Sequence, residues 1–175
     1  ALGGMFTSRI NMNLREDKHW SYGARTMFMD AANQRPFLVS TSVQTDKTSE
    51  SITEIRKELD EIVGARPLSA EELEKAKSNL TLKLPGSRET RYAIGNDMER
   101  MVTYGLPDDY FITYPDRIRA LTPETITDTA KSILFPGSVT WVVVGDLTKI
   151  KDKVEALKLG EVTVVPAEAQ TPTGQ

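Results

Sequence analysis

The feature that most limits the fold is a pair of neighbouring segments, residues 21–30 and 35–44, whose side chains alternate with a period of two. This is the period of a β-strand, in which successive side chains point to opposite faces of the sheet. Residues 31–34, which include Asn33, are typical of a turn. The sequence therefore predicts an antiparallel hairpin. In the first segment Tyr22, Ala24, Thr26 and Phe28 form one alternating set, and in the second segment Phe37, Val39, Thr41 and Val43 form another.

Helical periodicity dominates outside this hairpin. Residues 1–16 are predicted as a helix, and five more follow between residues 52 and 134. Their boundaries rest on local signals: Gly64 as a stop, Ser69 with Glu72 as a capping box, Pro85-Gly86 as a break, and Thr122-Pro123 as an N-cap followed by proline. In the helix predicted from about Glu89 to Tyr104, the side chains predicted to face inward are Ile94, Met98, Met101 and Val102.

The C-terminal part returns to strand signals. Residues 139–144 are the most β-branched run in the chain and predict a buried strand. A short amphipathic helix is predicted to reach Leu159, and residues 162–165 predict an edge strand. We therefore expect an α+β fold, in which a mostly antiparallel sheet has helices packed on one face. Residues 1–165 are predicted to form one domain, and residues 166–175 a disordered tail.

Composition removes several classes of function. The 22 basic and 25 acidic residues give a net charge of −3, which argues against a nucleic-acid partner, and no apolar run reaches the ~18 residues of a membrane span. The chain has no cysteine and a single histidine, His19, so its sequence cannot supply two or three histidine ligands to a metal. We interpret His19 as a surface or turn residue. The absence of cysteine is compatible with a bacterial periplasm, which we favour, and with a cytoplasm.

Arg15 and Tyr22 are the candidate functional pair. They lie seven residues apart, at the end of a predicted helix and the start of a predicted strand. An arginine offers a permanent charge and a planar fork of donors, and a tyrosine hydroxyl can donate to a developing oxyanion. The residues alone favour a simpler interpretation, in which Arg15 pairs with Glu16 or Asp17 and Tyr22 is a half-buried aromatic residue of the strand.

A resemblance to a known family changes that preference. The segments Leu2-Gly3-Gly4-Met5-Phe6-Thr7-Ser8-Arg9-Ile10-Asn11, Leu14-Arg15-Glu16 and Ser21-Tyr22-Gly23 resemble the start of the second homologous half of pitrilysin/insulinase zinc metallopeptidases. Similar segments follow in the family's order: residues 68–77, 104–110, 118–124 and 142–147. The resemblance implies that strands precede the Leu2-Gly3-Gly4 segment, so that the chain is most of one domain of a longer protein. The pair His19-Trp20 departs from the family's pattern, which more often has glycine followed by a hydrophobic residue.

The resemblance also implies a function. In this family one half carries zinc on an H-x-x-E-H motif, and the other, inactive half supplies an arginine and a tyrosine seven positions apart. Arg15 and Tyr22 match that pair, so both are predicted to bind substrate, and Tyr22 to stabilise the tetrahedral intermediate. We expect no metal in this chain, zinc on a partner domain or subunit, and no peptidase activity from the chain alone. The alternative is a structural core-type subunit of the same fold without a proteolytic role.

Overall fold

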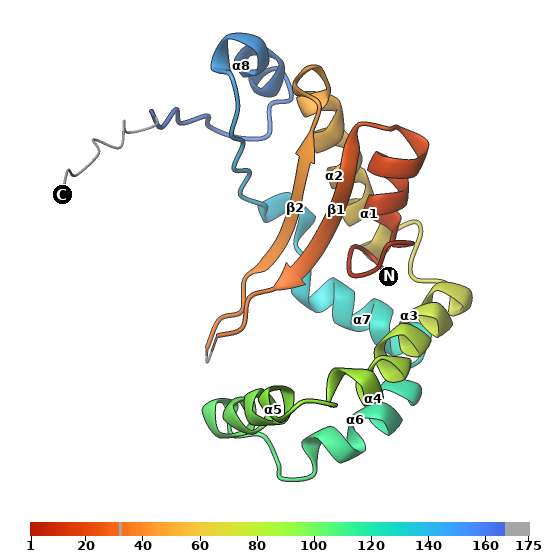
Figure 1. Cartoon of the computed structure of the whole chain (residues 1–175). Helices are drawn as coiled ribbons and strands as arrows, with labels where there is room; N and C mark the ends of the chain where they lie inside the picture. Colours follow the sequence, from red (N-terminus) through yellow and green to blue (C-terminus); the bar gives the residue numbers. More distant parts are fainter. Residues whose placement is uncertain (32, 167–175) are drawn as a thin grey trace, which may run out of the picture.

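The predicted hairpin is present in the structure, a computed structural model that describes residues 1–31 and 33–166. Strand β1 (Ser21–Phe28) pairs antiparallel with β2 (Phe37–Val43), and Phe28 lies opposite Phe37 with ring centres 5.1 Å apart. The predicted turn includes residue 32, which lies outside the described residues. The two strands form the sheet of the described part of the chain, so the sheet is smaller than we expected and the α+β fold is mostly helical (Figure 1).

The N-terminal helix is shorter than predicted. It begins at α1 (Arg9–Asn11) and continues as the π-helical turn η1 (Met12–Asp17). Residues 1–8 instead run beside β1, where the Gly3 carbonyl accepts a hydrogen bond from the Thr26 amide at 2.9 Å. A Cβ on Gly3 would lie 2.6 Å from the backbone nitrogen of Thr26. The glycine thus allows the chain to approach the strand closely, which the helical pattern of residues 5–14 did not reveal.

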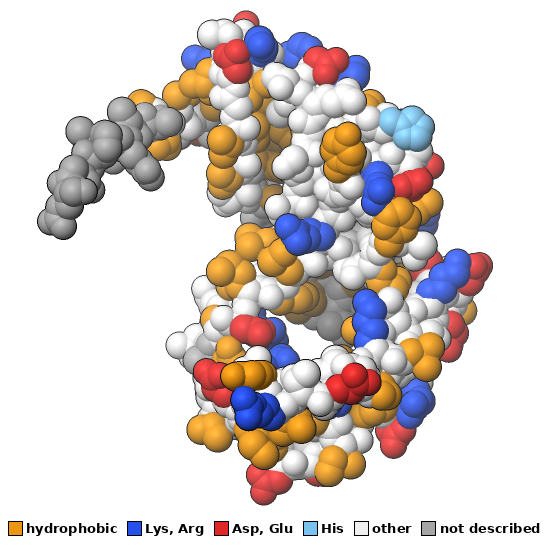
Figure 2. All heavy atoms as spheres, in the orientation of Figure 1, with side chains coloured by type: hydrophobic (Ala, Val, Ile, Leu, Met, Phe, Trp, Pro, Cys, Tyr) orange, Lys and Arg blue, Asp and Glu red, His pale blue; other side chains and the backbone are white. Residues whose placement is uncertain are grey.

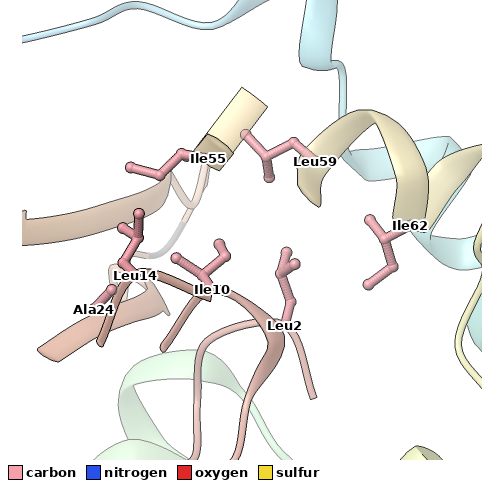
Figure 3. Packing of buried hydrophobic residues seen from close by; sticks show 7 residues of the cluster. All are labelled: Leu2, Ile10, Leu14, Ala24, Ile55, Leu59 and Ile62. Atoms are coloured by element: carbon pink, nitrogen blue, oxygen red, sulfur yellow. The ribbon is translucent and has the colours of Figure 1, made fainter. Parts of the chain in front are cut away.

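The core lies between this N-terminal segment, the hairpin and helix α2 (Thr48–Val63), which ends at Gly64 as predicted. Its buried side chains are Leu2, Ile10, Leu14, Ala24, Ile55, Leu59 and Ile62 (Figure 3). Helices α7 (Pro123–Ile133) and α8 (Leu147–Glu155) also pack against α2. Short 3-10 turns, η2 (Thr45–Lys47) and η3 (Pro136–Ser138), precede α2 and follow α7.

Four further helices form an arm away from the hairpin (Figure 1): α3 (Ala70–Leu82), α4 (Leu84–Ser87), α5 (Arg91–Tyr104) and α6 (Tyr110–Arg119). The capping box of Ser69 and Glu72 and the Thr122-Pro123 start of α7 are both present. The predicted break at Pro85-Gly86 is instead the short α4, because proline is tolerated within the first turn of a helix. None of the described helices is both long and apolar enough to cross a bilayer.

Four predictions about apolar segments are wrong. Residues 139–144 form no strand among the described residues, and Val144 is 94% exposed, because β-branched residues form a strand only where a neighbour completes the hydrogen-bond ladder. Residues 162–165 likewise form no strand, and the last helix ends at Glu155, before Leu159. On α5, Ile94, Met98 and Val102 are exposed rather than inward. Figure 2 shows hydrophobic side chains on the surface over this helix. Of the predicted disordered tail, residues 167–175 lie outside the described residues.

Candidate functional site

A β-bulge determines how Tyr22 is presented. Ser21 pairs with Val43 and Ala24 pairs with Thr41, so two residues of β1 lie opposite the single residue Ser42 of β2. Without the extra residue, Tyr22 would share the inner face with Ala24, as the alternation predicted. The bulge instead leaves the Tyr22 side chain 98% exposed. Bulges often redirect a side chain beside a functional site, and here the effect is a phenol that is fully available to a ligand.

Two hydroxyl groups hold the bulge in place. The Ser21 hydroxyl accepts a hydrogen bond from the Gly23 amide at 3.0 Å and donates to the Ser42 carbonyl at 2.8 Å. It also lies 2.8 Å from the Thr41 hydroxyl, which donates to the Gly23 carbonyl at 3.1 Å. These bonds give partners to the amide and the carbonyl of Gly23 and to the carbonyl of Ser42.

Asn11 also stabilises this bulge, through hydrogen bonds to the N-terminal segment and to β1. Its side chain is buried, its Nδ2 donates to the Phe6 carbonyl at 2.6 Å, and its Oδ1 accepts from the Ala24 amide at 3.0 Å. One side chain thus joins the N-terminal segment to β1, two residues after Tyr22. Sequence reasoning did not single out Asn11 or Ser21, because their partners are 13 and 20 residues away and leave no local pattern.

Arg15 lies in η1, six residues before the start of β1 at Ser21. Its guanidinium group stacks over the Phe6 ring at 4.5 Å from the ring centre, and its Nε lies 3.3 Å from a carboxylate oxygen of Glu16. The local ion pair that the residues alone suggested is therefore present. The side chain remains 38% exposed, so the outer part of the guanidinium group can still reach a ligand.

The structure does not bring the two candidates into contact. Within residues 1–31 and 33–166 no hydrogen bond or cation–π contact joins Arg15 to Tyr22. The two residues are nevertheless carried by adjoining elements, because the Trp20 amide donates to the Leu14 carbonyl at 2.9 Å and folds the connection between η1 and β1 tightly. His19 lies in this connection with a φ of 58°, exposed, and its Nδ1 is 3.1 Å from the Arg15 carbonyl.

An ion pair between the buried side chain of Arg9 and the partly exposed Glu72 joins this region to the helical arm. The Arg9 guanidinium donates to both carboxylate oxygens of Glu72, at 2.6 and 2.7 Å, and to the carbonyls of Arg66 and Pro67, at 2.5 and 2.9 Å. Glu72 also accepts from the Ser69 amide at 2.9 Å as part of the capping box. The hydrogen bonds from Arg9 are the main reason that the pKa of Glu72 is lowered to about 2. The sequence revealed the capping role of Glu72 but not its pairing with Arg9.

Comparison with known proteins gives a family match for the N-terminal part of the chain. Residues 1–80 match the family described as the peptidase M16 inactive domain. A sequence search of curated proteins gave no significant match. A solved structure of a peptidase M16 inactive domain from Pseudomonas fluorescens is similar to the chain with a TM-score of 0.70 and 21% identity. The match covers 77% of this chain and 32% of that one, so the chain spans about a third of that relative.

Two other solved structures share the fold. A putative zinc protease from Bordetella pertussis Tohama I has a TM-score of 0.62 and 19% identity, over 75% of this chain and 71% of that one. A conserved protein from Enterococcus faecalis V583 has a TM-score of 0.61 and 23% identity, over 74% and 30% of the two chains. Identities this low show a common fold only, whereas the family match is one of sequence. Residues 1–80 are therefore similar in sequence to the peptidase M16 inactive domain, and the solved structures show that about three quarters of the chain shares the fold of such a domain.

Proposed function

We propose that the chain is part of the non-catalytic half of an M16 metallopeptidase. In this proposal it pairs with a catalytic M16 domain, helps to close the chamber that holds the substrate, and binds peptide through Arg15 and Tyr22. The observation that carries the proposal is the presentation of Tyr22, which is 98% exposed on a hydrogen-bonded bulge within the segment that matches the family. A tyrosine with only a packing role would bury its ring.

The two side chains are suited to different tasks. The Tyr22 hydroxyl is a neutral donor that can hydrogen-bond to the carbonyl oxygen of the scissile peptide bond as negative charge develops on it. Arg15 can donate to a neighbouring backbone carbonyl of the substrate and so orient the peptide. Stacking on Phe6 restricts the guanidinium group, which reduces the entropy lost when it binds.

The metal in this proposal belongs to the partner domain. Zinc is held by histidine, cysteine and carboxylate side chains, and the described residues contain no group of three or more such side chains placed to hold a metal ion. His19, the single histidine, is directed to a backbone carbonyl. On the partner, zinc would supply Lewis-acid activation of water and of the peptide carbonyl. The residues of this chain would bind and orient the peptide and donate to its oxygen.

The experiment is Tyr22→Phe in the assembled protease. Loss of a donor that acts mainly in the transition state lowers kcat by about 10²–10³ and changes KM little. Tyr92→Phe is the matched control, because Tyr92 is also well exposed, at 72%, but lies on α5 in the helical arm. The zinc content of the assembled protease should be the same for both variants.

Two results would speak against the proposal. If Tyr22→Phe hydrolyses peptides as fast as Tyr92→Phe, Tyr22 has no role in stabilising the transition state. If the assembled protein hydrolyses no peptide at all, the structural core-type subunit is the better explanation. Neither outcome depends on whether this chain is active by itself.

A further inference from the structure

Arg25 is an exposed arginine on β1, three residues after Tyr22. The preceding residue, Ala24, is buried in the core, so the alternation of the strand directs Arg25 to the outer face of the hairpin. Tyr22 is 98% exposed and therefore also lies on that face. In Figure 1 the hairpin lies in front of α2, with this face toward the viewer. The strand that carries the candidate tyrosine thus also carries a cation.

Arg25 differs from the other arginines of the chain in its lack of a partner. Every other arginine of the described residues forms an ion pair with a carboxylate or stacks on an aromatic ring. For Arg25 no hydrogen bond, ion pair or cation–π contact is present within residues 1–31 and 33–166. Its guanidinium group therefore keeps all of its N–H donors for a ligand.

The nearby carboxylates are paired with other cations. Asp30 is the single acidic residue of the hairpin, and it is paired with Arg35 and lies 3.9 Å from Arg100. Glu16, which precedes β1, is paired with Arg15 at 3.3 Å. These carboxylates do not neutralise Arg25, and a cation without a counter-charge attracts negatively charged groups of a ligand.

The neighbouring strand adds a hydroxyl group at the same place. Ser40 lies directly opposite Arg25 in the register of the hairpin, and both side chains are exposed. The Cβ atoms of residues directly opposite each other are about 5 Å apart, so a group bound by the guanidinium is within reach of the Ser40 hydroxyl. A carboxylate suits this pair, because its two oxygens match the arginine fork and a hydroxyl can also donate to it.

The distance from Tyr22 indicates which part of a peptide lies at Arg25. A strand rises about 3.3 Å per residue, so the segment from Tyr22 to Arg25 spans at most about 10 Å. An extended peptide that lies along β1 covers the same distance in about three residues. With its scissile carbonyl at the Tyr22 hydroxyl, such a peptide has a residue about three positions away beside Arg25.

We propose that Arg25 is a specificity-determining residue that binds a carboxylate side chain of the peptide substrate, about three residues from the scissile bond. The inference rests on the proposed function, because it takes the peptide at Tyr22 as given. It adds the class of substrate: peptides with an aspartate or a glutamate at that position. Arg25 is remote from the bond that breaks, so it contributes to binding in the ground state and the transition state alike.

The test uses the assembled protease with peptides that carry glutamate or glutamine at each position up to four residues from the scissile bond. At one position kcat/KM should be about fivefold higher for glutamate at low ionic strength, the upper end of what an exposed ion pair provides. The difference should lie in KM rather than in kcat, and added salt should reduce it because exposed charges are screened. Arg25→Gln should bring the ratio close to one.

Charge reversal and a matched control make the test specific for Arg25. Arg25→Glu should reverse the preference at the same position, so that lysine is favoured there over glutamate. Arg119→Gln removes the same charge from an arginine that is 62% exposed on α6, and it should keep the preference for glutamate.

The outcomes separate the two proposals. A preference for glutamate that Arg25→Gln retains, or no preference at any position, overturns the role of Arg25 even when Tyr22→Phe still lowers kcat. If Arg25→Gln prevents assembly with the catalytic domain while Arg119→Gln does not, Arg25 binds that domain and the inference is also overturned.

The role of Arg25 can be measured when the proposed function fails. If Tyr22→Phe has no effect but the glutamate preference responds to Arg25→Gln, the role of Tyr22 fails and the inference about Arg25 holds. If the assembled protein hydrolyses no peptide, fluorescence anisotropy with the same peptides, labelled, gives the ratio of the Kd values for glutamine and glutamate. A ratio of one for the wild-type protein overturns the inference, and a ratio of about five that Arg25→Gln abolishes supports it.

Discussion

The ion pair between Arg9 and Glu72 should be the most sensitive point in the attachment of the helical arm. The arginine side chain is only 6% exposed, and all its observed partners lie in residues 66–72. Replacing Glu72 with glutamine removes the charge but keeps the shape and one acceptor oxygen. The buried guanidinium group would then lack a counter-charge, which is the costly way to break such a pair.

The expected loss of unfolding free energy depends on how exposed the side chains of Arg9 and Glu72 are. Removing one member of a fully buried pair costs about 3–5 kcal/mol. Glu72 is 31% exposed, so water replaces part of the lost interaction. The lowered pKa of Glu72, about 2 instead of 4.5, corresponds to at most about 3 kcal/mol before that screening is counted. We therefore expect Glu72→Gln to reduce the free energy of unfolding by about 2 kcal/mol at pH 7.

The pH dependence gives a second, independent check. A carboxyl group whose pKa is lower in the folded state stabilises the fold above its unfolded pKa, and this contribution is lost as the pH falls through the folded pKa. For Glu72 the window runs from about pH 4.5 down to about pH 2. Urea unfolding should show a constant difference between wild type and Glu72→Gln from pH 5 to pH 8. Below pH 4.5 the difference should shrink, because the protonated glutamate resembles glutamine.

The neighbouring residue provides the control. Glu71 is 78% exposed and paired with Lys75 on the same helix, so Glu71→Gln should leave the unfolding midpoint unchanged. A Glu72→Gln variant as stable as Glu71→Gln at pH 7 would show that Arg9 finds other partners. A stability difference that persists at pH 2 would show that the charge of Glu72 is not its cause.

Two other substitutions test how the N-terminal segment is joined to β1. Gly3→Ala should reduce the free energy of unfolding by about 2 kcal/mol or more, because the added Cβ would overlap Thr26, and the unfolding temperature should fall with it. Gly4→Ala is the control and should leave the unfolding temperature unchanged, because a Cβ there meets nothing within 4 Å. Asn11→Ala should leave the buried Ala24 amide without its acceptor, destabilise the fold by about 1–3 kcal/mol and speed hydrogen exchange at that amide; unchanged exchange would mean that the bulge does not need Asn11.

The elements that the sequence predicted well depend on local signals. The capping box at Ser69 and Glu72 and the Thr122-Pro123 start both use side chains within three residues of the groups they satisfy. The hairpin was predicted because a period of two is visible within each strand. These signals are all contained in short segments, so they can be interpreted without knowing the tertiary structure.

The predictions that failed depend on which other elements of the fold pack against a segment. Residues 139–144 have strong strand propensity, but propensity does not supply a partner strand. The pattern on α5 shows which of its faces is apolar, but not whether another element covers that face. The regular alternation predicts Tyr22 on the same face as Ala24, whereas the bulge depends on cross-strand bonds between Ser21 and Thr41.

The candidate site was likewise only partly predictable from the sequence. The spacing of Arg15 and Tyr22 identified the pair, but the residues that support them were found only in the structure. Phe6 links the two positions: its ring lies under Arg15, and its carbonyl accepts from Asn11, which in turn accepts from the amide that follows the bulge. In the proposed function Arg15 and Tyr22 need no direct contact to bind one peptide, because the same short segment contacts Arg15 and supports the strand that carries Tyr22. A change at Phe6 or Asn11 should therefore alter the relative position of the pair without removing either functional group.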